Sequence, residues 1–226
     1  LRFPSGGGSM HGIAVSANGR RVYLTTAQNA MHEAAIDEDG TARWTRRIDL
    51  PGPGGTGSSH GCGIALMPGG DRALVCLSLN NTLGVLDLGA GKLVREIPVG
   101  VAPYGVAILD DGRTAIVTNW GGRPRRGDRT APSGGTDVVV DGRGVASTGT
   151  VGFVDIAEGR MIAEIPVGLH PSDIARSSDG RTAYVANANS DTVSVLSLGN
   201  RRVVNTLRVR LPETRRPGAA PNALAV

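Results

Sequence analysis

The chain has 226 residues, of which 34 are glycine and 13 are proline, while only 3% are aromatic. Glycine costs about 1 kcal/mol in a helix interior, so glycines this frequent exclude long helical bundles and coiled coils, and they lack the three-residue period of collagen. A hydrophobic fraction of 40% excludes a wholly disordered chain. The net charge of +4 is too small to indicate a polyanion-binding protein by itself.

Short apolar runs follow one another along the chain, separated by Asp-Gly, Asn-Gly and Gly-Gly turns. Such runs, rich in valine and isoleucine, predict antiparallel strands joined as hairpins. They fall into four groups of four. In chain order we expect strands at 11–16, 20–26, 31–37 and 42–50; at 61–67, 72–78, 82–88 and 92–99; at 104–109, 113–119, 150–156 and 160–167; and at 172–177, 181–187, 192–198 and 202–209. No apolar run reaches the roughly 18 residues of a membrane-spanning helix, so we expect no membrane span.

Internal repeats relate these groups to one another. The string Asp-Gly-Arg-Thr-Ala occurs at 111–115 and 179–183, and Glu-Ile-Pro-Val-Gly at 96–100 and 164–168, each pair 68 residues apart. A four-stranded unit with a period of 40 to 50 residues is the blade of a β-propeller. The alternative, a β-sandwich of unrelated hairpins, would not produce this spacing.

We therefore predict an all-β protein, a β-propeller built of four-stranded antiparallel blades. It is expected to be one propeller segment over 1–226, with blades at about 11–50, 61–99, 104–167 (interrupted by an insertion at 120–149) and 172–209, and the start of a further blade at 221–226.

The connections predict where a binding site would lie. Turns after the first and third strands are short, whereas the loops after second strands and the links between blades vary in length. Variable loops on a rigid scaffold usually carry binding. We call their side the loop face, and its candidate binding residues are His11, His60, Tyr104, Trp120, Arg123, Arg125, Arg126, His170 and Asn187.

Two of the second strands resemble a known family. Residues 116–119 read Ile-Val-Thr-Asn and residues 184–187 read Tyr-Val-Ala-Asn, which resembles the Tyr-Val-Thr-Asn motif of the YncE-like YVTN-repeat propellers, a WD40-like repeat. The likeness covers 60–226 and is looser in the first blade, where 22–26 read Val-Tyr-Leu-Thr-Thr. Family members usually have seven blades and are exported bacterial proteins. The resemblance thus implies that the roughly four blades here are part of a larger ring in a periplasmic or secreted protein.

The insertion at 120–149 is similar to one subgroup of that family. The segments 119–128 and 135–141 resemble proteins in which the propeller precedes a phosphoesterase domain of the alkaline phosphatase superfamily. Residues 136–147 are predicted to form a hairpin turning at Asp141-Gly142. The first part of the insertion carries four arginines, Arg123, Arg125, Arg126 and Arg129. They predict that the insertion is a docking loop for a phosphate-bearing ligand or a partner domain. The alternative is a solvated surface loop.

The histidines and cysteines give two further candidates. His11 and His60 are each expected just before an innermost strand, in the same position, and His170 precedes Pro171. They form either a metal or anion site or three solvated link residues. Only Asp173 accompanies them, no close-spaced ligand motif occurs, and the resemblance adds no metal, so we predict no cofactor.

Cys62 and Cys76 are the only cysteines. A hairpin register centred on Gly69 sets them opposite each other on one sheet face. In an exported protein they would be able to form a disulfide. The alternative is a pair of buried thiols, and a slip of one residue would place them on opposite faces.

The sequence predicts no catalytic set, because it has neither a G-x-S-x-G elbow nor a His-Glu-x-x-His motif. We expect a non-catalytic binding or scaffolding module which, by the resemblance, is the N-terminal part of a phosphoesterase. A lactonase-like hydrolase remains an alternative, although the inner strands offer only two or three acidic or amide ligands. A single-stranded nucleic-acid-binding propeller is another, with Tyr104 and Trp120 as its stacking side chains. The sequence does not name the ligand.

Overall fold

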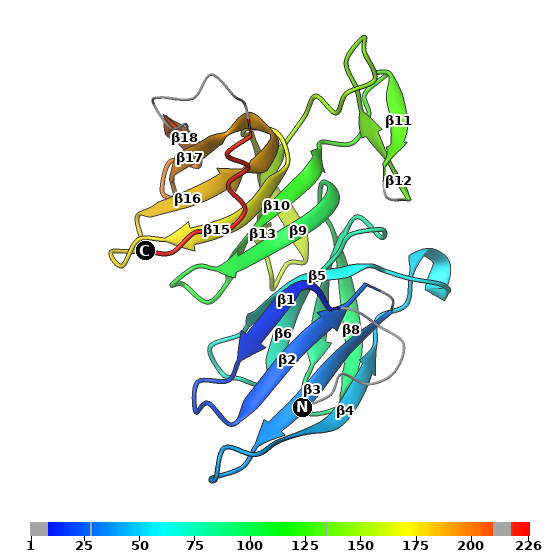
Figure 1. Cartoon of the computed structure of the whole chain (residues 1–226), viewed down its shortest axis with the longest axis vertical. Helices are drawn as coiled ribbons and strands as arrows, with labels where there is room; N and C mark the ends of the chain where they lie inside the picture. The colour runs from blue at the N-terminus through cyan, green and yellow to red at the C-terminus, as the bar shows by residue number, and fades with distance from the viewer. Residues whose placement is uncertain (1–8, 28, 134, 210–217) are drawn as a thin grey trace. The chain divides into compact units, whose positions relative to one another are not determined.

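The computed structural model describes residues 9–27, 29–133, 135–209 and 218–226 (Figure 1). It divides into two compact units, Leu1–Pro98 and Val99–Val226. Within the described ranges the regular structure is strand except for two short 3-10 turns, η1 (Pro53–Gly55) and η2 (Ala188–Ser190). No helix in these ranges has the length and apolar character needed to cross a membrane.

The first unit contains two four-stranded antiparallel sheets in which spatial order follows chain order. One sheet is formed by β1 (Ser9–Val15), β2 (Arg21–Thr26), β3 (Ala30–Ile36) and β4 (Ala42–Asp49), and the other by β5 (Gly61–Leu66), β6 (Arg72–Leu77), β7 (Thr82–Asp87) and β8 (Lys92–Pro98). Their bounds agree with the predicted strands to within two residues.

The second unit contains two further sheets of the same kind and a small hairpin. The sheets are formed by β9 (Val101–Ile108), β10 (Thr114–Gly122), β13 (Thr150–Asp155) and β14 (Arg160–Pro166), and by β15 (Pro171–Arg176), β16 (Thr182–Asn187), β17 (Thr192–Ser197) and β18 (Arg202–Arg208). The predicted fold class, all-β with four-stranded antiparallel blades, is confirmed.

The largest difference from the predicted strand bounds is in the third blade. β9 begins at Val101 and β10 continues to Gly122, so each is three residues longer than expected at that end. The register shifts on both sides of the Asn119–Pro103 pair and then resumes with Gly122 opposite Val101. Beyond these bulges the β9–β10 pair continues to Val101 and Gly122 at its loop-face end.

The insertion differs from its prediction in one element. The turn at Asp141 is present, closed by a bridge between Val140 and Ala146. The named hairpin, however, pairs β12 (Thr136–Val139) with β11 (Thr130–Ser133), a strand that was not predicted. β11 contains Pro132, which favours a loop in sequence-based reasoning but is tolerated on an edge strand.

The core of each unit lies between its two blades. In the first unit, Tyr23, Met31 and Ile48 of the first blade pack against Ile64 and Val75 of the second. In the second unit the corresponding cluster joins β10, β13 and β14 to β16 and β17, with Phe153 fully buried. Because side chains alternate along a strand, every second residue of these runs lies in such a layer.

A threonine in the second strand links neighbouring blades. The Thr25 hydroxyl accepts the Gly12 N–H at 3.1 Å and donates to the Cys62 carbonyl at 2.8 Å. Thr118 accepts the Gly105 N–H at 2.8 Å in the same way. Glycine is required at 105, because a Cβ there would lie 2.6 Å from the carbonyl oxygen of Ser172 in the next blade.

Residues 218–226 form no strand. Side-chain carboxylates hold their backbone instead. Asp191 accepts the N–H groups of Gly218 and Ala220 at 3.0 and 2.9 Å, and Asp173 accepts that of Leu224 at 2.7 Å. At 221–226, where the start of a further blade was expected, the chain lies beside β15 without forming a strand.

Candidate functional site

Three of the predicted site residues meet in the second unit. Tyr104 lies in β9, Trp120 near the end of β10, and His170 in the link before β15. The ring centroids of Tyr104 and Trp120 are 3.8 Å apart with an interplanar angle of 19°, and those of Trp120 and His170 are 3.8 Å apart at 31°. Stacked pairs contribute about 0.5–1.5 kcal/mol each. We call these three residues the ring cluster.

Backbone geometry brings the third ring into the cluster. His170 has a φ of 56°, a left-handed conformation that is uncommon outside glycine. Its carbonyl accepts the Ala188 N–H at 3.1 Å, which closes the turn into β15. His60 and Ala102 have φ values of 54° and 52°, and they precede His170 at the spacings of the repeat. The left-handed turn is thus a feature of each link, and only at 170 does it carry a ring against Trp120.

The ring cluster contains two buried polar atoms. Nε1 of Trp120 and Nδ1 of His170 are inaccessible and have no hydrogen-bond partner within the described ranges. Burial lowers the pKa of His170 and so favours the neutral form of its imidazole. Buried polar atoms are nearly always paired in proteins. These two nitrogens are therefore unpaired polar groups in the interior of the cluster.

The insertion packs against this cluster. Its Val138 and Val140 are buried with Val101 and Ala102 of β9, and the side chain of Trp120 packs against the same apolar group. The Thr148 hydroxyl also donates to the Gly121 carbonyl at 2.7 Å, so the insertion is anchored to its own blade and does not behave as a free loop.

The insertion arginines divide into two groups. Arg123 makes a two-pronged ion pair with Asp128 at 2.8 and 3.1 Å. This pair and the N–H of Arg126 lower the pKa of Asp128 to about 2. Arg129 donates to the Gly142 carbonyl at 3.2 Å.

The side chains of Arg125 and Arg126 are exposed and form no ion pair with any residue that the structure describes. Of the four predicted arginines, these two are the ones for which no side-chain hydrogen bond or ion pair is found among the described residues.

Asn187 lies inside its blade. It is fully buried, and its side-chain amide donates to Thr192 Oγ1 at 3.1 Å and Ser194 Oγ at 2.9 Å. Asn119 is buried in the same way and donates to Thr150. The motif asparagine therefore ties the second strand to the third, and the structure gives it no place on the loop face.

The first two histidines do not occupy equivalent positions. Ile13 pairs with Leu24 and Ile64 with Val75, which places His11 two residues before the matched isoleucine and His60 four before it. The expectation that they share one position is wrong, because the matched isoleucines are 51 residues apart and the two histidines are 49 residues apart. His11 lies within β1, and His60 precedes β5.

The predicted histidines do not form a metal site in the described part of the chain. No three His, Cys, Asp or Glu side chains there are grouped so as to hold a metal ion. Asp173, the carboxylate expected beside the histidines, accepts backbone N–H groups from Ile174 and Leu224.

Cys62 and Cys76 are buried free thiols, which is the alternative that the sequence left open. The expected register holds only at the Gly61–Leu77 pair, and it shifts between Gly61 and Ile64, where Cys62 lies. Burial raises the pKa of Cys62 to about 12 and that of Cys76 well above its usual value.

Sequence reasoning missed the apolar part of the site. The run Val138-Val139-Val140 is the signal that marks it, since three consecutive valines in a polar insertion require a surface to pack against.

Comparison with known proteins places this architecture. No family model matches the chain, and no curated protein matches it. Among solved structures it is similar to the hydrazine synthase of Kuenenia stuttgartiensis, with a TM-score of 0.67 and 18% identity over 88% of this chain and 49% of that one. The fold is a β-propeller.

A second similar structure is a functionally unknown protein from Desulfotomaculum acetoxidans DSM 771, with a TM-score of 0.65 and 17% identity over 92% of this chain and 59% of that one. The propeller thus spans about half the length of these two chains. Identities this low establish the fold alone.

Proposed function

We propose that this propeller is a non-catalytic binding or scaffolding module whose binding surface is the ring cluster and the insertion of the second unit. The observation that carries the proposal is the meeting of Tyr104, Trp120 and His170, from three separate segments, with 3.8 Å between neighbouring ring centroids. Two buried nitrogens of that cluster lack partners within the described ranges.

The charges beside the cluster favour a phosphate-bearing ligand or partner. Arg125 and Arg126 project from the insertion that packs against Trp120, and both are exposed. Guanidinium groups bind phosphate oxygens in a bidentate manner.

The resemblance to YncE-like propellers supports a particular context. We propose that the module belongs to an exported bacterial protein, periplasmic or secreted, and precedes a phosphoesterase domain that it contacts through the insertion. The remaining coding sequence tests this. A following domain with Asp, Thr and His metal ligands is expected, and a stop codon soon after a seventh blade would contradict it.

Calorimetric titration tests the binding function. The probes are inorganic phosphate and phenyl phosphate, and the variant is Arg125→Ala combined with Arg126→Ala. We expect saturable binding that the double variant weakens by about tenfold or more. Arg143→Ala is the matched control, because Arg143 is an exposed arginine of the same insertion whose guanidinium pairs with Asp141. It should change the affinity less than about twofold.

Two results would overturn the proposal: no binding of either probe by the folded chain, or equal loss of affinity in the control.

Incubation with phenyl phosphate and with a lactone, with and without divalent metal ions, tests the non-catalytic assignment. Turnover that scales with chain concentration would favour the hydrolase alternative.

The ring cluster also gives a specific reason to retain the nucleic-acid alternative, because stacking aromatics beside cations bind single strands. Tyr104 and Trp120 stack on each other, however, which leaves less ring surface for bases. Fluorescence anisotropy with a labelled oligothymidylate distinguishes the two. Salt-dependent binding tighter than that of phenyl phosphate would favour nucleic acid.

A further inference from the structure

A buried carboxylate lies between the two blades of the first unit. Glu33 in β3 has a side chain that is only 3% exposed. It pairs across the sheet with Tyr23, as Phe153 pairs with Ile116 in the third blade. The repeat therefore places a charged residue where the second unit has a fully buried phenylalanine.

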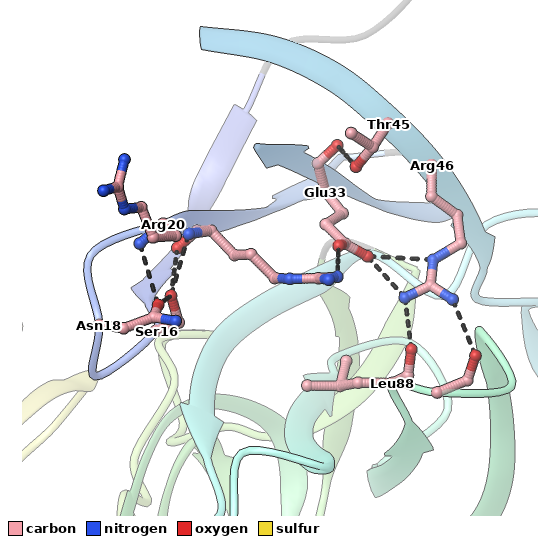
Figure 2. Close-up of polar contacts among 9 residues, drawn as sticks. Ser16, Asn18, Arg20, Glu33, Thr45, Arg46 and Leu88 are labelled. Atoms are coloured by element: carbon pink, nitrogen blue, oxygen red, sulfur yellow. Dashed lines mark hydrogen bonds and ion pairs between the residues drawn. The ribbon is translucent and has the colours of Figure 1, made fainter. Parts of the chain in front are cut away.

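Two arginines pair with this carboxylate (Figure 2). Arg46 donates to Glu33 through Nε at 3.0 Å and Nη2 at 2.6 Å, and it also donates to the carbonyls of Leu88 and, at 3.1 Å, Gly89. Arg21 forms the second ion pair with Glu33. Two cations and one anion leave a net positive charge. The excess lies at Arg21, whose side chain is 56% exposed, whereas that of Arg46 is 28% exposed.

A cavity of about 710 Å³ opens beside Arg21. Its walls include the apolar groups of Val15 and Tyr23 from the first blade and of Leu66 and Met67 from the second. A smaller hollow of about 390 Å³ reaches Glu33 and Arg46 and shares Arg21 with the larger one. Cavities of this size, mostly apolar with a few placed polar groups, are typical of small-molecule sites.

Stability alone does not explain the Glu33 cluster. Replacing a buried ion pair by apolar residues of similar volume is often neutral or stabilising, and Phe153 shows that an apolar residue serves at the matching position. The charged cluster instead holds the Arg21 guanidinium at the edge of the cavity. Glu33 raises the pKa of Arg21, although a guanidinium is charged at neutral pH without this help.

We propose that this cavity binds a small organic carboxylate with an apolar body. The carboxylate pairs with Arg21, which has more N–H donors than its bonds to Glu33 and Tyr23 use. The apolar body lies against Leu66 and Met67. Asp71, the carboxylate of the cavity lining, lies at the β5–β6 turn next to Gly69, so it disfavours a second anionic group on the ligand.

Titration calorimetry on the full chain tests the site with 3-phenylpropionate and with 3-phenylpropionamide, its neutral match. We expect the carboxylate to bind about tenfold more tightly than the amide. Arg21→Gln should remove that preference, while Glu33 keeps its pair with Arg46. Arg20→Gln is the control, since Arg20 is the preceding arginine, pairs with Glu38 and does not line the cavity.

A cavity-filling variant separates binding from folding. Met67→Trp should occupy the space, abolish binding of 3-phenylpropionate and leave the Glu33 cluster in place. Equal binding of acid and amide, no saturable binding of the acid, or unchanged binding in either folded variant would each overturn the proposal. Because this site lies in the first unit, its failure leaves the phosphate-binding proposal for the second unit untouched.

Discussion

At the scale of single residues, one hydroxyl recurs at the joint between blades. Thr25 and Thr118 each satisfy a glycine N–H of their own innermost strand and reach a carbonyl of the next blade. A buried N–H without a partner costs free energy, so these threonines matter beyond the volume that they fill.

The hydrogen bond of the Thr118 hydroxyl predicts how an isosteric substitution changes the free energy of unfolding. Thr118→Val leaves the Gly105 N–H buried and unpaired, and we expect the free energy of unfolding to fall by about 1–3 kcal/mol. Thr118→Ser keeps the donor and acceptor and should lose less. Urea denaturation measures both. Equal stability of the valine variant and the original chain would contradict the proposed role of the hydroxyl.

The burial of Cys62 and Cys76 predicts that their thiols are alkylated slowly in the folded protein. A pKa of about 12 for Cys62, against the usual 9.0, lowers its thiolate fraction at pH 8 by about a thousandfold. We expect two thiols that react with iodoacetamide in urea and resist it in the folded protein, measured by mass spectrometry. Rapid alkylation of the folded chain would contradict the burial, and no alkylation in urea would show a disulfide.

Asp128 predicts a pH dependence within the insertion. Its pKa of about 2 lies below the usual 3.8, mainly because of the bond from Arg123. A lowered pKa stabilises the folded form above pH 3.8, and this contribution disappears as the pH falls through about 2. Carboxylate chemical shifts measured against pH should show this midpoint. Arg123→Gln should return it toward 3.8, and a midpoint near 3.8 in the unaltered chain would contradict the ion pair.

The sequence identified Tyr104, Trp120 and His170 as candidate binding residues, but it did not predict that their rings contact one another. Tyr104 and Trp120 were placed on the loop face because they follow a link and end a strand. Their contact with His170 depends on two bulges in the β9–β10 pair and on a left-handed backbone at 170. Neither leaves a mark in local composition, since histidine and alanine both occupy that conformation here.

At the scale of elements, the strands were predictable and the insertion only partly so. Each strand is an apolar run bounded by a turn signal, and the repeat supplies four examples. The insertion occurs once, so its β11 strand, which contains Pro132, had no repeat to support it. Glu33 was not predicted as a buried residue, because a charged side chain within an apolar strand indicates a surface position.

The packing of the insertion makes a prediction for this element. Val138 is 6% exposed against β9, whereas Val145 of the same insertion is 50% exposed. We expect Val138→Ala to lower the free energy of unfolding by about 1.5 kcal/mol and to shift the emission of Trp120. Val145→Ala, the matched control, should change stability by less than about 0.5 kcal/mol. Equal effects would show that the insertion does not pack as described.

At the scale of the whole molecule, the period of the repeat is more informative than the length. It predicted the four blades, and the comparisons with solved structures agree on the fold. The blades are not interchangeable, however. Between the blades of the second unit lies the apolar side chain of Phe153, whereas the matching position in the first unit holds a charged cluster beside a cavity. Blades of the same fold therefore differ in their chemistry.

The most direct test of the proposed binding surface is the fluorescence of Trp120. The chain has two tryptophans, so a Trp44→Phe variant leaves Trp120 as the sole indole within the ring cluster. Titration with phenyl phosphate should change its emission saturably, and adding Arg125→Ala and Arg126→Ala should raise the concentration needed for that change by about tenfold or more. Emission that stays constant in the folded variant up to millimolar phenyl phosphate would contradict the account.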